Sequence, residues 1–406
     1  VTVNTKATGT ITINIGGTDH IIGIINGKAI VSVSDLVAGN YTVDVKYAGD
    51  VNFIGANVTT NFTIGLVDPS LGVVVGNITY GNDATIIVTV DPAVTGKVNI
   101  TVNGASHMVD IVNGRATLTV SGLAAGSYPV TVSYDGNAVF ANATVNAEFI
   151  VSKINPGISV NVGNTTYGNN ATVFVTMDAR GNGTVNITVN GKTYTQTIKD
   201  GKVILPISGL GAGVYKVTVS YDGDGNFTAA IAEAEFTVSA INPGMTVNVG
   251  NITYGANATV TVNVNPAATG RVNITVNGAS HMVDIVNGKA TLVLSGLAAG
   301  SYTVTVSYNG DSNFTATTVT ADFVVAKINP GMNVDVATDD FGGKANVTVT
   351  VNTNATGKVN ITVNGTTYEV DIVDGKAVLN LTGLAPGKYT VTVSYDGDGN
   401  FTAATA

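Results

Sequence analysis

The sequence predicts an all-β fold, built as a linear array of five tandem β-sandwiches. The first observation is a spacing, because five tyrosines recur every 87 residues without insertion or deletion: Tyr41, Tyr128, Tyr215, Tyr302 and Tyr389. A fixed period of this length indicates one domain copied end to end. The second is composition, since the 44% of residues that are hydrophobic are mostly Val, Ile and Ala, and Trp is absent. β-Branched residues favour pleated, half-buried strands.

The period divides the chain into five repeats. They are called repeats 1 to 5 below and comprise residues 1–66, 67–153, 154–240, 241–327 and 328–406. Val1 aligns with Val88 and Ala406 with Val319, so we expect repeat 1 to lack its first strand and repeat 5 its last. We expect the chain to be a window on a longer array. The alternative is that a neighbouring subunit supplies the missing strands, as in donor-strand exchange.

Repeat 4 shows the predicted strands most clearly. Seven segments have alternating or β-branched character: 245–249, 258–264, 272–276, 281–286, 289–294, 302–308 and 317–325. Asn277-Gly278 and Asn287-Gly288 separate three of them. Asn-Gly is a strong hairpin signal because both turn positions need φ > 0. Seven short antiparallel strands in one 87-residue repeat predict a sandwich of two sheets.

The loop before the sixth strand has the pattern Leu-x-x-Gly-x-Tyr, clearest from Leu384 to Tyr389. It resembles the tyrosine corner of immunoglobulin-like sandwiches, in which the phenol bonds to backbone a few residues upstream. The segment 288–314 resembles the bacterial-type Ig-like tandem repeats of large prokaryotic surface proteins. The Asn/Thr-rich, cysteine-free composition is similar to adhesin-like proteins of methanogenic archaea. The resemblance covers essentially the whole chain and implies tandem seven-stranded immunoglobulin-like β-sandwiches in a linear array.

Charge and composition exclude several function classes. The net charge is −9 and the 18 Lys and Arg residues do not cluster, so we expect no nucleic-acid partner. Cysteine is absent, so disulfides and thiolate metal sites are excluded. Only four Glu are present, and no Gly-x-Ser-x-Gly elbow or matching triad occurs. We therefore expect no catalytic residues, no cofactor and no enzyme.

Three rows of Asn-x-Thr sequons repeat with the same period. They are Asn99, Asn186, Asn273 and Asn360, then Asn77, Asn164 and Asn251, then Asn226, Asn313 and Asn400. In the first row, Asn273 lies between inward-facing Val272 and Ile274 and is expected to face solvent, where a sequon is a plausible N-glycan acceptor. The alternative is that Asn/Thr-rich strands generate sequons by chance. The periodicity favours covalent N-glycans.

Two loops resemble the start of a Ca²⁺-binding loop, in which oxygen ligands alternate. Their candidate ligands are Asp222, Asp224 and Asn226, and Asp396, Asp398 and Asn400. The distal Glu of such a loop is absent, and the equivalent segments 135–139 and 48–52 do not keep the carboxylates. We favour the interpretation of a turn between the last two strands over a Ca²⁺ site.

His20, His107 and His281 share one repeat position, and Tyr194 and Tyr368 fill it elsewhere. A metal ligand or catalytic histidine would not be exchanged with tyrosine in this way. We interpret these residues as packing between strands.

The junctions between repeats are short, as in Lys153-Ile154-Asn155-Pro156-Gly157. Proline restricts its own φ and the residue before it, so we expect stiff joints and a rod very roughly 150–200 Å long. The predicted function is a structural stalk or filament of the cell surface, extracellular and glycosylated, that supports adhesion or cell–cell linkage. The alternatives are an adhesin module that binds glycans or proteins through its repeats, and a pilus-like polymer with strand exchange. Expected partners are further repeats of the chain, identical subunits end to end, or surface glycans and proteins, with a membrane anchor outside this fragment.

Overall fold

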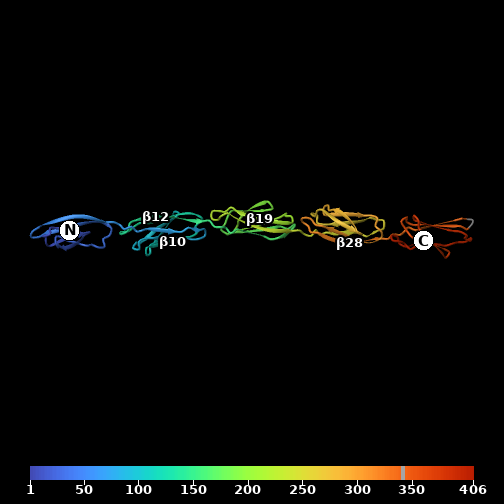
Figure 1. Cartoon of the computed structure of the whole chain (residues 1–406), viewed down its shortest axis with the longest axis horizontal. Helices are drawn as coiled ribbons and strands as arrows, with labels where there is room; N and C mark the ends of the chain where they lie inside the picture. Colours follow the sequence, from blue (N-terminus) through green and yellow to red (C-terminus); the bar gives the residue numbers. More distant parts are fainter. Residues whose placement is uncertain (340–342) are drawn as a thin grey trace.

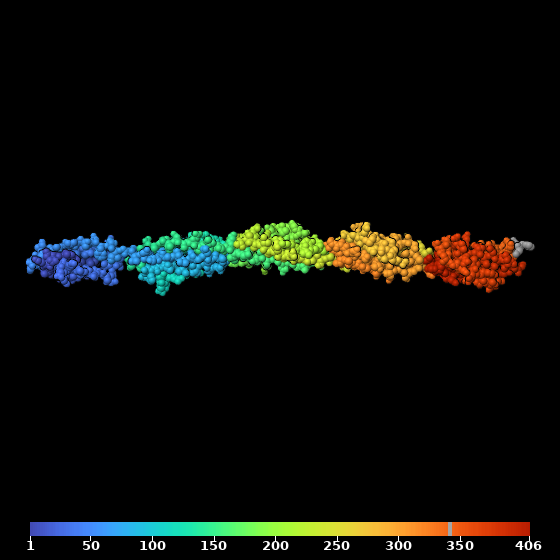
Figure 2. All heavy atoms as spheres, in the orientation of Figure 1, coloured from blue at the N-terminus to red at the C-terminus, as the bar shows by residue number. Residues whose placement is uncertain are grey.

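The computed structural model describes residues 1–339 and 343–406. The five repeats follow one another along a single axis, from repeat 1 at the N-terminal end to repeat 5 at the C-terminal end (Figure 1). The same order is visible on the molecular surface, where each repeat forms one bulge of the rod (Figure 2). The predicted all-β class is confirmed, because every regular element in the described residues is a strand. Within them, no helix is long and apolar enough to cross a membrane.

Repeat 3 shows the complete domain. Its strands are β13 (Ser159–Val162), β14 (Thr165–Thr166), β15 (Ala171–Thr176), β16 (Thr184–Val189), β17 (Lys192–Thr197), β18 (Lys202–Ile207), β19 (Gly213–Tyr221) and β20 (Ala230–Ser239). They form a three-stranded sheet in the order β13-β15-β18 and a five-stranded sheet in the order β14-β20-β19-β16-β17. The two sheets pack face to face as the predicted sandwich.

Repeats 2 and 4 have the same topology. The strands of repeat 2 are β5 (Gly72–Val75), β6 (Ile78–Thr79), β7 (Ala84–Thr89), β8 (Lys97–Val102), β9 (Ala105–Asp110), β10 (Arg115–Val120), β11 (Gly126–Tyr134) and β12 (Ala143–Ser152). Those of repeat 4 are β21 (Thr246–Val249), β22 (Ile252–Thr253), β23 (Ala258–Asn263), β24 (Arg271–Val276), β25 (Ala279–Asp284), β26 (Lys289–Leu294), β27 (Gly300–Tyr308) and β28 (Thr317–Ala326).

All seven strands predicted in repeat 4 are present, and the structure adds one short strand. β21 pairs antiparallel with β23 in the smaller sheet, whereas β22 pairs parallel with β28 in the larger one. The chain therefore changes sheet between them, and this switch ties the two sheets together at the edge of the sandwich. The turn Asn277-Gly278 closes the predicted hairpin of β24 and β25, with φ of 50° and 82°. The turn Asn287-Gly288 has the expected positive φ, 51° and 74°, but the prediction of a hairpin there is wrong, because β25 belongs to the larger sheet and β26 to the smaller one.

The outer repeats are less complete. Repeat 1 contains β1 (Thr10–Ile15), β2 (Thr18–Gly23), β3 (Gly39–Gly49) and β4 (Ile54–Ile64). Repeat 5 contains β29 (Asn333–Thr338), β30 (Ala345–Thr350), β31 (Lys358–Val363), β32 (Thr366–Asp371), β33 (Lys376–Leu381), β34 (Val391–Tyr395) and β35 (Ala404–Thr405).

Repeat 1, all of which the structure describes, forms a single four-stranded sheet. Repeat 1 was expected to lack its first strand only, but it lacks the whole smaller sheet that repeats 2 to 4 have. The segment 28–33, equivalent to β10, forms no strand, because the partner equivalent to β7 aligns mostly before Val1. The inner face of the sheet consequently borders a cavity of about 630 Å³, lined by residues that include Ile11 and Val58.

The cores are filled by the inward-facing residues of both sheets. In repeat 4, Val272, Ile274 and Val306 are fully buried between the sheets. In the described part of the chain, no polar or charged residue is buried as a whole. Burying one Val or Ile side chain stabilises the fold by about 1.5–3 kcal/mol. The many β-branched residues thus give repeats 2 to 5 an apolar core between two sheets, and the polar side chains lie mainly on the outer faces and in the loops.

Candidate functional site: the joints between repeats

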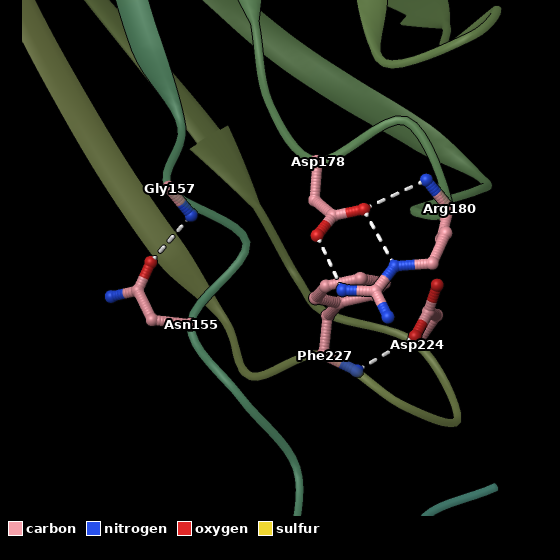
Figure 3. A network of polar contacts seen from close by, with 6 residues as sticks. All are labelled: Asn155, Gly157, Asp178, Arg180, Asp224 and Phe227. Atoms are coloured by element: carbon pink, nitrogen blue, oxygen red, sulfur yellow. Dashed lines mark hydrogen bonds and ion pairs between the residues drawn. The ribbon is translucent and has the colours of Figure 1, made fainter. Parts of the chain in front are cut away.

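The linker between repeats 2 and 3 is hydrogen-bonded to repeat 3. Ile154 donates its N–H to the carbonyl oxygen of Asn226 (3.1 Å), and its own carbonyl oxygen accepts the N–H of Thr228 (2.9 Å). Gly157 then donates its N–H to Oδ1 of Asn155 (2.8 Å), which closes a tight turn next to the proline (Figure 3). The predicted short junction is therefore a paired backbone segment, in agreement with its lack of Gly/Ser-rich sequence.

One asparagine side chain reaches across each of three joints. The N–H of Ala125 in repeat 2 donates to Oδ1 of Asn226 in repeat 3, at 2.8 Å. The equivalent bonds join Ala212 to Asn313 and Ala299 to Asn400, also at 2.8 Å. We call this bond the amide latch. It links the loop before the sixth long strand of one repeat to the loop before the last strand of the next.

An aromatic pair lies at the same three joints. Tyr80 of repeat 2 follows β6 and packs on Phe227 of repeat 3, with ring centroids 5.5 Å apart and an interplanar angle of 78°. The equivalent pairs are Tyr167 with Phe314 and Tyr254 with Phe401. Edge-to-face pairs of this kind add about 0.5–1.5 kcal/mol beyond the area they bury. Because Phe227 is itself a core residue, each tyrosine connects its own repeat to the core of the next.

The loop that carries the latch is held by an acidic side chain. In repeat 4, Oδ1 of Asp311 accepts the N–H groups of Asn313 and Phe314, at 2.8 and 3.0 Å. Its Oδ2 accepts both the N–H and the hydroxyl of Thr269 at 2.9 Å. Burial pulls the pKa of Asp311 upward, but these donors and the Tyr308 hydroxyl outweigh it and lower the pKa to about 2. The carboxylate thus stays ionised and fixes the loop.

The predicted Ca²⁺ candidates lie in these loops. Asp224 and Asp398 occupy the position of Asp311 and accept the same backbone N–H groups, so their oxygens are already engaged. Asp222 and Asp396 are exposed in the turns. Among the described residues, no group of three or more His, Cys, Asp or Glu is placed to hold a metal ion.

One part of the sequence interpretation needs correction. The carboxylates of this motif were predicted not to be kept between repeats. The third position of the motif is in fact Asp in four repeats, including Asp50, and in repeat 2 Asn137 takes its place. Oδ1 of Asn137 accepts the N–H groups of Val139 and Phe140 at 2.8 Å, as the carboxylates do elsewhere. What is maintained is an acceptor oxygen that shapes the loop.

Two of the three sequon rows have structural roles that the sequence analysis missed. Asn226, Asn313 and Asn400 form the amide latch. In the second row, Oδ1 of Asn77 accepts the N–H of Ile150 at 2.8 Å. Asn164 and Asn251 make the same bond to the last strand of their repeats. These asparagines therefore hold the point at which the first strand changes sheet.

The first row of sequons, Asn99, Asn186, Asn273 and Asn360, faces outward as expected but is only half-exposed. Oδ1 of Asn186 accepts the Thr195 hydroxyl at 2.7 Å. In Asn99 and Asn273 the amide oxygen is buried, with no hydrogen-bond partner among the described residues.

The histidines lie on edge strands, as expected for packing residues. His107 on β9 is paired across the strands with buried Ile100 on β8, and His20 and His281 have equivalent partners. Tyr194 and Tyr368 take the same place opposite an isoleucine.

The tyrosine corner predicted from Leu-x-x-Gly-x-Tyr is present in all five repeats. Tyr302 donates its hydroxyl to the carbonyl oxygen of Ala298, four residues upstream, at 3.0 Å. The equivalent bonds of the other four tyrosines measure 2.8–3.0 Å. The corner fixes the loop whose N–H groups serve the amide latch.

Comparison with known proteins agrees with this architecture. The chain matches the family described as Bacterial Ig-like domain (group 3) over residues 72–152, 245–326 and 332–406, together more than half of its length. It is 27% identical over 242 residues to the inverse autotransporter adhesin YeeJ of Escherichia coli (strain K12), a match that spans 52% of this chain and 10% of the adhesin.

Solved structures of two other tandem proteins are also similar. Sidekick-1 immunoglobulin domains 1–5 match 98% of this chain and 90% of theirs, with 14% identity and a TM-score of 0.27. Fibronectin(III)-like modules of Clostridium thermocellum CbhA match 42% of this chain and 94% of theirs, with 14% identity and a TM-score of 0.19. From the extent of the family match, the chain belongs to the bacterial Ig-like domain (group 3) family.

Proposed function

We propose that this chain is a section of a stiff extracellular stalk or filament, whose repeats hold a functional part away from a cell surface. The observation that carries the proposal is the joint. The amide latch and the aromatic pair recur in the same geometry at three successive joints, for example through Asn313 and Phe314. A flexible chain of domains would not need a side-chain hydrogen bond and a ring contact at each boundary.

Two further observations support an extracellular, mechanical role. The family is built of Ig-like domains, and the matched relative is named as an adhesin. The chain also carries many surface Asn and Thr residues, arranged as Asn-x-Thr sequons that can accept N-glycans on an extracellular protein. We propose that exposed sequons carry N-glycans, that neighbouring repeats are the main partners, and that catalysis has no part in the function. The similarity to archaeal adhesin-like proteins remains a prediction.

Small-angle X-ray scattering and negative-stain electron microscopy of the intact chain test the stiffness. A straight particle of roughly the predicted 150–200 Å is expected. Replacing the latch residues together, as Asn226→Ala, Asn313→Ala and Asn400→Ala, should produce bent particles with a smaller maximum dimension. The control replaces the third sequon residue, Thr228→Ala, Thr315→Ala and Thr402→Ala. It removes the sequons and two long hydroxyl contacts to the linker, at 3.5 Å from Thr228 and Thr402, and it keeps the latch. Particles of the unaltered chain that bend at the three joints with the latch would contradict the proposal.

Immunogold labelling of intact source cells tests the location. Antibodies against the repeats should decorate the cell exterior, with gold at a distance from the membrane. Label confined to the cell interior would contradict an extracellular stalk.

A further inference from the structure

The joints differ in one respect that bears on how the rod bends. Resting on the proposed stalk function, we propose that Arg180 clamps repeats 2 and 3 into one rigid unit, and that the joint between repeats 1 and 2 is the hinge of this array.

The clamp is a guanidinium group at the aromatic contact. The Cζ atom of Arg180 in repeat 3 lies 4.8 Å from the centroid of the Tyr80 ring in repeat 2, and 5.9 Å from that of Phe227. A cation over an aromatic face is attracted by the ring quadrupole, and Arg adds planar stacking. Repeat 3 therefore holds Tyr80 with its own phenylalanine ring and with a positive charge.

Asp178 fixes this guanidinium in position. Nε of Arg180 donates to Oδ1 of Asp178 at 3.0 Å, and Nη2 donates to Oδ2 at 2.7 Å (Figure 3). The backbone N–H of Arg180 also donates to Oδ1, at 2.9 Å. A bidentate ion pair restricts the rotation of a long side chain. Arg180 is thus held in the joint before Tyr80 contacts it.

A glycine in repeat 2 makes room for the clamp. A Cβ atom on Gly81 would lie 2.6 Å from Nη1 of Arg180. The equivalent glycines at the next two joints, Gly168 and Gly255, have no such neighbour within 4 Å. At those joints Ala267 and Asn354 occupy the position of Arg180. The aromatic pair and latch are therefore shared by three joints, whereas the cation is specific to one.

The joint between repeats 1 and 2 lacks the latch acceptor. Val139 stands where the other joints have Asn226, Asn313 or Asn400, and its side chain offers no hydrogen-bond acceptor. The linker there still pairs through its backbone, as Val67 donates its N–H to the carbonyl oxygen of Val139 at 2.8 Å. This joint keeps the covalent connection and the backbone pairing, so it bends more easily than the others.

Distances between spin labels in the intact chain test the proposal. The chain contains no cysteine, so pairs of introduced cysteines can be labelled without background. Thr117→Cys with Ile204→Cys spans joint 2/3, and Ile204→Cys with Thr291→Cys spans joint 3/4 at equivalent exposed positions. Ile30→Cys with Thr117→Cys spans joint 1/2. The width of each distance distribution reports the range of bending.

We expect the distance distribution to be narrowest across joint 2/3, wider across joint 3/4 and widest across joint 1/2. Arg180→Ala should broaden the distance distribution across joint 2/3 until it is as wide as that across joint 3/4. Arg180→Lys should broaden it less, because an ammonium keeps the positive charge but cannot stack on the ring. The clamp should also be transferable. Asn265→Asp together with Ala267→Arg places the Asp178 and Arg180 pair at the equivalent positions of repeat 4, and should narrow the distance distribution across joint 3/4. Val139→Asn should narrow joint 1/2.

Equal widths at joints 2/3 and 3/4 in the unaltered chain would overturn the clamp, as would an unchanged joint 2/3 in Arg180→Ala. A distance distribution across joint 1/2 that is as narrow as the one across joint 3/4 would overturn the proposed hinge. These outcomes differ from a failure of the stalk itself, which would give wide distance distributions at every joint and particles that bend at every joint in the microscope.

Discussion

Oδ1 of Asn313 lies 2.8 Å from the backbone nitrogen of Ala212, a residue 101 positions earlier that belongs to the preceding repeat. Asn313 also begins an Asn-Phe-Thr sequon, so its periodic recurrence has two physical explanations. A glycan attaches to Nδ2, whereas the latch uses Oδ1. The two explanations can therefore be separated by substitution.

Asn313→Ala should weaken the joint between repeats 3 and 4. The half-buried N–H of Ala212 would be left without its acceptor, which should cost about 1–3 kcal/mol of the free energy that holds the two repeats together. Hydrogen exchange measured by mass spectrometry should show faster exchange around Ala212, with little change in repeat 2. Thr315→Ala is the matched control, because it removes the sequon and leaves Oδ1 in place. Equal effects of both substitutions would contradict a structural role for the latch.

Acid should release the loop before the last strand in repeat 4 and spare the same loop in repeat 2. The folded pKa of Asp311 is lowered to about 2, so its contribution to stability is present above the unfolded value near 4. That contribution is lost as the pH falls through about 2. Asn137 holds the equivalent loop without a titrating group.

A pH titration followed by NMR checks this difference. The amide signal of Phe314 should shift with a midpoint near pH 2, and that of Phe140 should not follow a carboxyl titration. Asp311→Asn should abolish the shift of Phe314 while leaving the loop closed. A Phe314 midpoint near pH 4 would show that the carboxylate is not stabilised by its donors.

The turn glycines provide a test of close packing. Gly288 has φ of 74°, and a Cβ there would lie 2.8 Å from the carbonyl oxygen of Val264 and 2.9 Å from Cα of Pro266. Gly296 has a similar φ of 70° but nothing within 4 Å. Gly296→Ala should lower the free energy of unfolding by about 1–2 kcal/mol, the cost of holding alanine in the left-handed backbone conformation. Gly288→Ala should cost clearly more, because backbone atoms must move. Chemical denaturation of the two variants compares them directly, and equal losses would contradict the contact.

The strands were predictable from sequence because their signals are local. Alternating Val and Ile residues and the turn Asn277-Gly278 sufficed to place the hairpin of β24 and β25. The turn Asn287-Gly288 has the same local signal but connects the two sheets, a difference that depends on which distant strand β26 pairs with. The short strand β22 was not predictable in this way, because its two residues are defined by parallel pairing with β28, far along the chain. Asn251, whose side chain holds that crossover, was interpreted from its sequon alone.

Proline predicted stiff joints, but the side-chain contacts across them were not predicted, for the same reason. The role of Asn226 depends on Ala125, which lies in another repeat. A signal was present nonetheless, since Tyr80, Tyr167 and Tyr254 recur with the 87-residue period, and so does the sequence Asn-Phe-Thr. Arg180 gave no periodic signal because it occurs at one joint, and its part in the contact follows from geometry alone.

Glycan occupancy should differ between the sequon rows. Asn77 and Asn164 are exposed, and their bonds use only Oδ1, so Nδ2 is available for attachment. Asn99 and Asn273 are half-buried with enclosed amide oxygens. Glycopeptide mass spectrometry of material from the native source should find higher occupancy at Asn77 than at Asn99. An intact mass equal to the bare polypeptide would remove the glycan proposal altogether.

Removing the hydroxyl of Tyr302 should measure how much the tyrosine corner contributes to the stability of repeat 4. Tyr302→Phe deletes the bond to the carbonyl oxygen of Ala298 but keeps the ring stacked on Phe323, whose centroid lies 5.3 Å away. The expected loss is about 0.5–1.5 kcal/mol in the unfolding of repeat 4, the usual net value of one hydrogen bond. Tyr302→Leu should cost more because the stacking is lost as well.

The matched control for this substitution is Tyr368→Phe, which removes a hydroxyl from an exposed ring on edge strand β32. Hydrogen exchange resolved by repeat assigns each loss to its own domain. Because the corner holds the loop that contains Ala299, Tyr302→Phe should also speed exchange at the latch to Asn400. If Tyr302→Phe is as stable as Tyr368→Phe and the latch is unaffected, the corner does not support the joint.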